Sequence, residues 1–249
     1  DVAATHYEAI LNSGACVIDM SGYAAMVGDT PLLTLASPDE TIEGFRYAGG
    51  IALAHAVNTM LHGALVALKE FGLNALTVNT YEAAGGFGKR ALRQLNEQSA
   101  RVLNGLPVVG QQVAYSVLPL PTTQNETLAY QLARLLGSGV DVSYSRARVP
   151  VFHGHTLCLS VVLGQWVDLQ TVIDALNNQQ HYVFTHDKSM QHSDKDLEND
   201  DVTGEQVSVF NVEAGAAEGE FTLWLHADSV KFCAVETALA LVQRLVLSR

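Results

Sequence analysis

Apolar residues recur at helical spacing in several stretches of the chain. One such face runs through residues 56–71 and stops at Gly72, a residue type that commonly ends helices. Further helices are predicted at residues 3–11, between residue 89 and Gly105, at 126–136, at 169–176 behind a capping Asp168, and from a capping Asp228 to the C-terminus.

Short apolar or alternating runs lie between these helices and predict strands. Their residue ranges are 15–19, 31–35, 73–79, 113–118, 140–144, 156–163, 181–185, 206–212 and 221–226. Helices that alternate with short apolar strands are typical of α/β folds, so we expect this class.

Residues 148–155, RVPVFHGH, join two of these expected strands. Pro150 lacks a backbone N–H and Gly154 can adopt a conformation closed to other residues, so we expect a short kinked segment. Such a segment would point Arg148 and His155 out of the sheet into one place. A permanent cation beside an imidazole suits anion binding and proton transfer. The alternative is a surface arginine and a hydrogen-bonded histidine at the end of a sheet.

Residues 80–89, TYEAAGGFGK, form a glycine-rich turn that leads into a helix. Backbone N–H groups at a helix start can hold an anion, but such glycines also serve simply to turn the chain. The acidic run at 193–201 lacks the glycine and the terminal glutamate of a calcium-binding EF-hand loop, so a solvated loop is predicted there.

The composition narrows the class of partner. The 249 residues suit one large domain or two smaller ones, and a formal charge of −12 with a pI near 5.0 argues against nucleic acid or an anionic membrane as partner. No run approaches the roughly 20 apolar residues of a membrane-spanning helix, and no signal peptide is recognisable. Cys16, Cys158 and Cys233 lie far apart, which predicts free thiols in a cytoplasmic protein rather than disulfides, nucleophiles or a metal site.

Four motifs in order resemble those of the aspartate-semialdehyde dehydrogenase family. VIDMSG at 17–22 is similar to its V-I-D-x-S-S/G, and TYEAAGGFG at 80–88 to its T-Y-Q-A-x-S-G-A-G. RVPVFHGH at 148–155 is similar to its R-V-P-V-x-x-G-H, and DSVK at 228–231 to its D-N-L-R. Within this family, the chain is most similar to the Usg-type paralogue at residues 88–89 and 95–105. The active enzymes of the family serve amino-acid biosynthesis.

The resemblance implies two parts. Residues 1–55, with the C-terminal helix at 228–249, would be the remnant of a Rossmann-type nucleotide-binding domain. Residues 56–227 would form the mixed-sheet α+β dimerisation and catalytic domain of the semialdehyde dehydrogenase type, which is glyceraldehyde-phosphate-dehydrogenase-like. The G-x-G-x-x-G dinucleotide fingerprint does not occur before the first strand, so we expect the N-terminal part of the nucleotide-binding domain to be missing.

The family reaction needs a cysteine thiolate that attacks the aldehyde, hydride transfer to NADP, and phosphate to release the acyl group. Counting back from residues 68–69 places Thr59 where that cysteine belongs, and a threonine hydroxyl is far less nucleophilic. Glu82 stands at the family's glutamine. Arg148 and His155 match its substrate-carboxylate arginine and its general base. We expect all four to share one cleft, with Glu82 paired to Arg148.

Cofactor contacts are expected to be weak or absent. The matching positions are Gly85, Gly86 and Ser229, but Ser229 replaces an asparagine and Cys233 a glycine of the closing motif. The resemblance therefore favours a Usg-type homodimer without dehydrogenase activity, able to pair with an active paralogue. The alternative is an NAD(P)-dependent oxidoreductase acting on a semialdehyde or acyl phosphate, with its cofactor half outside this chain.

Overall fold

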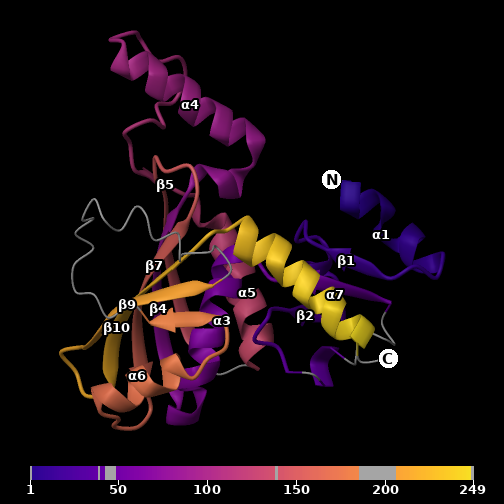
Figure 1. Cartoon of the computed structure of the whole chain (residues 1–249), viewed down its shortest axis with the longest axis vertical. Coiled ribbons are helices and arrows are strands. Elements are labelled where there is room, and N and C mark those ends of the chain that lie inside the picture. The colour runs from indigo at the N-terminus through magenta and orange to yellow at the C-terminus, as the bar shows by residue number, and fades with distance from the viewer. Residues whose placement is uncertain (1, 39, 43–48, 138–139, 185–205, 248–249) are drawn as a thin grey trace.

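The computed structural model describes residues 2–38, 40–42, 49–137, 140–184 and 206–247. Its larger sheet is mixed and has seven strands, and the smaller sheet lies to one side of it (Figure 1). Strands β4 and β6 pair in parallel, as do β8 and β9, whereas β4–β7, β7–β10, β10–β9 and β5–β6 are antiparallel. In spatial order the strands are β5 (Leu118–Pro119), β6 (Asp141–Arg148), β4 (Leu73–Glu82), β7 (His155–Leu163), β10 (Glu220–Ala227), β9 (Val207–Ala214) and β8 (Tyr182–Phe184). The predicted α/β class is confirmed.

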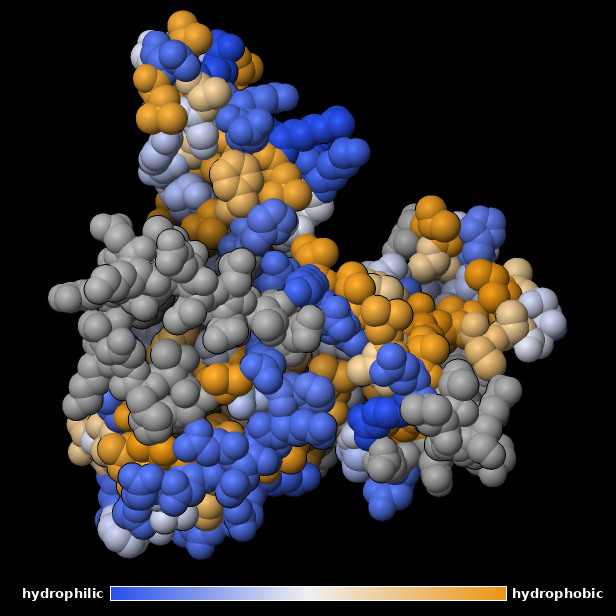
Figure 2. Space-filling model, viewed as in Figure 1, coloured by the Kyte–Doolittle hydropathy of each residue, from blue (hydrophilic) through white to orange (hydrophobic). Residues whose placement is uncertain are grey.

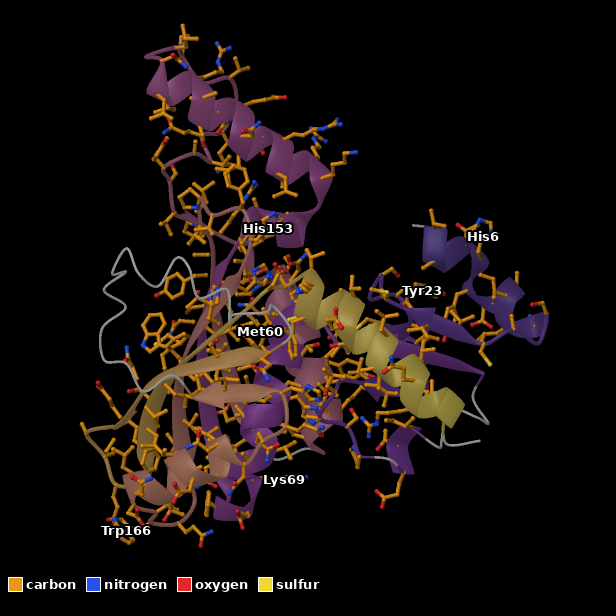
Figure 3. The ribbon with its side chains drawn as sticks, in the orientation of Figure 1. His6, Tyr23, Met60, Lys69, His153 and Trp166 are labelled. Carbon is orange, nitrogen blue, oxygen red and sulfur yellow. The ribbon has the colours of Figure 1, made fainter. Side chains whose placement is uncertain are left out.

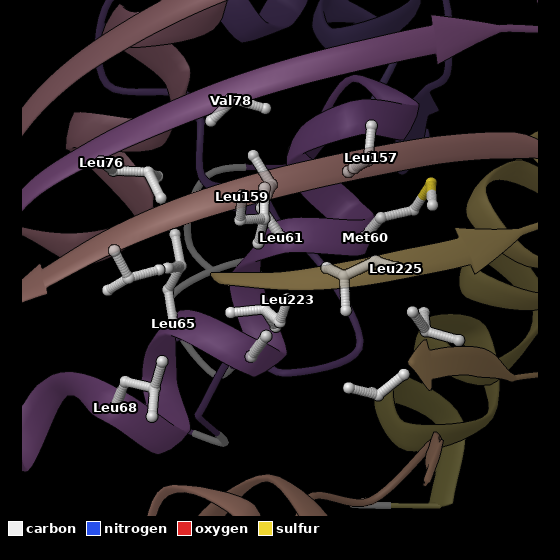
Figure 4. Close-up of a cluster of buried hydrophobic side chains, with 14 of the residues drawn as sticks. Met60, Leu61, Leu65, Leu68, Leu76, Val78, Leu157, Leu159, Leu223 and Leu225 are labelled. Atoms are coloured by element: carbon white, nitrogen blue, oxygen red, sulfur yellow. The ribbon is translucent and has the colours of Figure 1, made fainter. Parts of the chain in front are cut away.

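One face of this sheet is covered by helices α3 (Ala56–Leu68), α5 (Asn125–Leu136) and α6 (Leu169–Asn177). Along β7 every second residue is buried, so Leu157 and Leu159 point into the layer between sheet and helices. Leu61 and Leu65 meet them from α3 (Figure 4). The expected cap of α6 is present, because a carboxylate oxygen of Asp168 accepts a hydrogen bond from the N–H of Thr171.

A smaller, parallel sheet has the order β1 (Val17–Asp19), β3 (Gly50–Leu53), β2 (Leu32–Leu33) and carries helix α1 (Val2–Asn12) near β1. Helix α7 (Thr237–Leu247) packs against it, with Leu241 among Leu33, Ile51 and Leu53. Strand β3 was not predicted. Its four residues are buried and apolar without alternation, so period-2 patterning could not reveal a central parallel strand there.

Helix α4 (Lys89–Leu103) projects away from the sheets, and residues 84–117 are called the α4 arm below (Figure 1). The strand predicted at 113–118 is wrong except for its last residue, since β5 starts at Leu118. The N–H groups of Val113 and Ala114 donate to the side-chain oxygen of Gln98 instead of a neighbouring strand, and Tyr115 has φ +59°. The side-chain amide of Gln98 on α4 thus takes the hydrogen bonds that a neighbouring strand would have made with residues 113–114.

The C-terminal helical region begins at the predicted cap, where an oxygen of Asp228 accepts from the N–H groups of Val230 and Lys231. Its first part, Lys231–Glu236, is a π-helix that continues into α7. In the described part of the chain no helix is long and apolar enough to cross a membrane. The acidic run at 193–201 lies outside the described residues.

Candidate functional site

A cavity of about 390 Å³ opens where the end of β4, the start of α3, the start of β7 and the beginning of the C-terminal helical region meet. It is called the pocket below. The polar side chains that line it come from these elements, from β6 and α5, and from segments beside both sheets. They are Ser21, His55, Glu82, Gln124, Gln131, Arg146, His155 and Ser229.

The structure brings together some of the expected site residues and not others. Glu82 and His155 line the pocket, as do the expected cofactor positions Gly85, Gly86 and Ser229. Thr59 and Arg148 do not line it, so the expectation that all four catalytic positions share this cleft is wrong.

Thr59 lies one turn inside α3, is 4% exposed, and donates its hydroxyl to the carbonyl of Ala54. The helix begins at Ala56 with His55 as its N-cap, and these two residues line the pocket instead. Thr59, the position that the resemblance gives to the nucleophile, thus lies one turn further into the helix than the residues that line the pocket. Histidine is not a favoured N-cap residue, so no sequence signal marked His55.

Arg148 is the register partner of Glu82 in the parallel pair β4–β6, yet the two side chains do not pair. The Arg148 guanidinium lies over the ring of Phe87, with 5.3 Å between its central carbon and the ring centroid, and it donates to the carbonyl of Ala91. Arg148 is half-buried at the base of the α4 arm. The predicted Glu82–Arg148 pair is wrong because the arm offers this arginine an aromatic face and a carbonyl.

Glu82 pairs instead with Arg146, which lies two residues before Arg148 on β6. The Nε of Arg146 lies 2.7 Å from Oε1 of Glu82 and its Nη2 2.9 Å from Oε2, a bidentate arrangement. The Thr80 hydroxyl donates to Oε1 as well, and Nη1 of Arg146 donates to Gln124. The two charged side chains are 1% and 3% exposed. Burial opposes ionisation of Glu82, but the hydrogen bonds and charge of Arg146 hold its pKa below the ordinary value.

His155 is 1% exposed, and burial lowers its pKa to about 4, so the ring is neutral at pH 7. Its Nδ1 accepts a hydrogen bond from the N–H of Ala83, which puts the proton of the neutral ring on Nε2. A Cβ at Gly86 would lie 2.6 Å from Cε1 and Nε2, so only glycine fits there. The same point is 3.8 Å from the hydroxyl of Ser229, which is buried and has no hydrogen-bond partner among the described residues.

The segment between β6 and β7 holds His155 in this place. Backbone N–H groups of Ala84 and Gly85 donate to the carbonyls of Val151 and Phe152, which ties the segment to the end of β4. Gly154 has φ +83°, and a Cβ there would meet the ring of His226 at 2.6 Å. The kink expected from the proline and glycine is thus confirmed, and His153 lies beside it where the arm joins the large sheet (Figure 3).

His55 provides the second imidazole of the pocket. Its ring Nδ1 accepts a hydrogen bond from the backbone N–H of Val57, and the backbone N–H of His55 donates to the side-chain oxygen of Gln131. Burial lowers its pKa, with the charge of Glu82 acting in the opposite direction. Both pocket histidines are therefore neutral donors through Nε2 at neutral pH.

A family model described as the dimerisation domain of semialdehyde dehydrogenases matches residues 65–231, more than half of the chain. The chain belongs to the semialdehyde dehydrogenase family. The matched part includes Glu82, Arg146, His155 and Ser229, whereas His55 lies before it.

Sequence relatives point the same way. An aspartate-semialdehyde dehydrogenase of Shewanella sp. (strain DB6705) is 32% identical over 161 residues, which cover 58% of this chain and 47% of the relative. One from Rickettsia bellii is 23% identical over 248 residues and covers 92% of this chain and 72% of the relative. The chain spans about half the length of the curated relatives that it matches first, for instance 47% of the Shewanella protein.

Solved structures share the fold. The aspartate semialdehyde dehydrogenase II of Vibrio cholerae complexed with ASA superimposes with a TM-score of 0.89 over 99% of this chain and 76% of that one, at 23% identity. The Candida albicans enzyme solved with NADP gives a TM-score of 0.72 at 17% identity, over 99% of this chain and 75% of that one.

No ionised thiol serves the pocket of this family member at neutral pH. Cys233, from the π-helix, lines the pocket, but burial raises the pKa of its thiol far above neutrality. Cys158 lies on β7 outside the pocket, and Cys16 is exposed. Among the described residues no group of three or more His, Cys, Asp or Glu side chains is arranged to hold a metal ion.

Proposed function

We propose that this chain is a semialdehyde dehydrogenase-family protein, of the Usg type, without phosphorylating dehydrogenase activity, and that its pocket binds a small molecule without reducing or oxidising it. The observation that carries the proposal is the missing nucleophile. Thr59 lies outside the pocket with its hydroxyl bonded to a carbonyl, and the pocket's cysteine, Cys233, is held as a neutral thiol.

NADP is the cofactor with which the Candida albicans relative was solved, and we propose that this chain binds it weakly or not at all. Phosphate groups are usually held by arginine or lysine side chains. The described lining of the pocket contains one guanidinium, that of Arg146, and Glu82 already neutralises it. Calorimetry should find a Kd above about 10 μM, weaker than about −7 kcal/mol. Tighter binding would contradict this part of the proposal.

The activity test compares the purified chain with the Vibrio cholerae enzyme as positive control. Each is given aspartate semialdehyde, NADP and phosphate, and NADPH formation is followed by absorbance. We expect no phosphate-dependent reduction by this chain under conditions in which the control turns over. Measurable phosphate-dependent turnover would overturn the proposal and favour an oxidoreductase.

We also propose a homodimer, which could be exchanged for a heterodimer with an active paralogue, in a reducing cytoplasm that keeps the three cysteines free. The matched family model is a dimerisation domain, and the α4 arm presents apolar side chains at its surface (Figure 2). These exposed residues are Leu103, Leu106, Val109, Tyr115 and Val117. A permanent interface should bury roughly 2,000 Å² or more. Light scattering that gives a monomeric mass at micromolar concentration would exclude it.

A further inference from the structure

We propose that the pocket takes an uncharged polar small molecule that carries a hydrogen-bond acceptor, and that the Glu82–Arg146 ion pair excludes anionic molecules from it. The inference rests on the proposed function, because it takes the pocket to be a binding site. It adds the class of ligand and names the two residues that set it.

The charges that line the pocket cancel. Among the described lining residues only Glu82 and Arg146 are ionised at neutral pH, since burial keeps His55 and His155 uncharged. The guanidinium directs Nε and Nη2 to the two oxygens of Glu82 and Nη1 to Gln124. A carboxylate that belongs to the protein thus occupies the cation that an anionic ligand would require.

An external anion cannot easily displace Glu82. The side chain is attached to β4 beside its partner, so its effective concentration far exceeds that of any dissolved carboxylate. The pair is almost completely buried, with exposures of 1% and 3%. An anion that entered without displacing it would lose its hydration and find no cation, which is strongly unfavourable.

The pocket nevertheless offers hydrogen-bonding groups that an uncharged ligand can use. His155 offers an N–H at Nε2, because Nδ1 is occupied by the Ala83 N–H. The buried hydroxyl of Ser229 has no hydrogen-bond partner in the described part of the chain, and a hydroxyl can both donate and accept. Gly86 has no side chain, which lets the ring of His155 lie against its backbone, 2.6 Å from where a Cβ would stand. A carbonyl, amide or hydroxyl oxygen of a ligand in the pocket can accept from the imidazole or from the serine hydroxyl, and the second contact would satisfy the unpaired serine.

Succinamide and succinate test this inference because they have the same size and shape but differ in charge. Calorimetry on the wild-type chain at pH 7.5 should show succinamide bound at least about tenfold more tightly than succinate. In the Glu82→Gln variant, the guanidinium of Arg146 loses its carboxylate partner and is free to bind an anion. Succinate should then gain roughly ten- to hundredfold in affinity, as expected for hydrogen bonds to a charged group, and the order should reverse.

Two control variants accompany the test, and thermal unfolding checks that each is folded. Glu97→Gln makes the same change of net charge on the exposed surface of α4 and should keep the wild-type order. The double variant Glu82→Gln with Arg146→Gln has no unpaired buried charge and no cation to offer. It should also keep the wild-type order, and it supplies the comparison if the single variant does not fold.

Four outcomes would overturn the inference. These are equal or tighter binding of succinate by the wild type, an unchanged order in folded Glu82→Gln, a preference for succinate in the double variant, and no binding of succinamide by any variant. Failure of the proposed function looks different. Phosphate-dependent NADP reduction by a wild-type chain that still prefers succinamide would reject the inactivity and leave the ligand class standing.

Discussion

Strand β6 ends in two arginines that enter two different regions of the molecule. Arg146 lies in the pocket, almost without exposure and bound to Glu82, whereas Arg148 lies half-buried at the base of the α4 arm over Phe87. The two residues share a strand and a face, since successive side chains alternate. Their difference shows that strand geometry selects the direction of a side chain, while the elements packed beside it select the partner.

The largest effect expected from this comparison is on stability. Arg146→Met leaves the Glu82 carboxylate buried without its partner and should cost about 3–5 kcal/mol of unfolding free energy. Arg148→Met removes a contact over an aromatic ring at a half-buried site and should cost about 1 kcal/mol or less. Urea unfolding at pH 7 measures both. Equal losses would show that the two regions do not differ as described.

The pocket should also lose stability in acid, through His155. Its folded-state pKa of about 4 lies below the usual 6.5, so the unfolded chain binds its proton first as the pH falls. The stability that neutral His155 contributes is complete above about pH 6.5 and declines toward pH 4, by on the order of 3 kcal/mol.

Unfolding free energies measured across this range should decline less steeply in His155→Gln than in the wild type. The exposed His6→Gln serves as control and should leave the slope unchanged. A His155→Gln variant with the wild-type slope would show that the pocket does not hold this ring neutral.

A buried amide in the α4 arm ties helix α4 to the segment that follows it. Gln98 is 5% exposed, and its side chain accepts from the N–H groups of Val113 and Ala114 and donates to the carbonyl of Gln111. Gln98→Ala should cost about 2 kcal/mol, because buried N–H groups lose their acceptor.

We expect this loss to appear as faster hydrogen exchange confined to residues 105–117, with the large sheet unaffected. Gln94→Ala is the matched control, since Gln94 makes one long contact, of 3.5 Å, to the same carbonyl. Faster exchange throughout the large sheet would mean that arm and sheet unfold as one unit.

The smallest expected effect is a difference in the reactivity of a thiol placed at the start of α3 or one turn inside it. His55→Cys puts a thiol at the N-cap in the pocket, where a helix start lowers thiol pKa, whereas Thr59→Cys puts it one turn inside the helix. The first should react with iodoacetamide at least about tenfold faster than the second.

Neither variant should gain semialdehyde dehydrogenase activity, because the Glu82–Arg146 pair still occupies the cation. The wild type, whose own cysteines are also present in both variants, gives the background rate of labelling. Faster labelling of the thiol at position 59 would restore Thr59 as the pocket residue at the start of this helix.

Much of the architecture could be read from local patterns. The spacing of apolar residues predicted α3, α5 and α6 and the strands β4, β6, β7 and β10, because helices and strands that face one core repeat with fixed periods. The pattern failed at β3, a buried strand without alternation, and at residues 113–117, where the amide of Gln98 takes the role of a strand partner.

The sequence by itself determined the family and the α/β class, and its motifs at the ends of strands placed Glu82 and His155 in one cleft. Only the tertiary structure decided that Arg146 rather than Arg148 neutralises Glu82, and that His55 rather than Thr59 stands at the pocket. Both outcomes depend on how distant parts of the chain pack together. The Arg148 guanidinium lies over the ring of Phe87 in the arm, and α3 begins at Ala56, so His55 faces the pocket. Such contacts are set by packing, which sequence spacing does not encode.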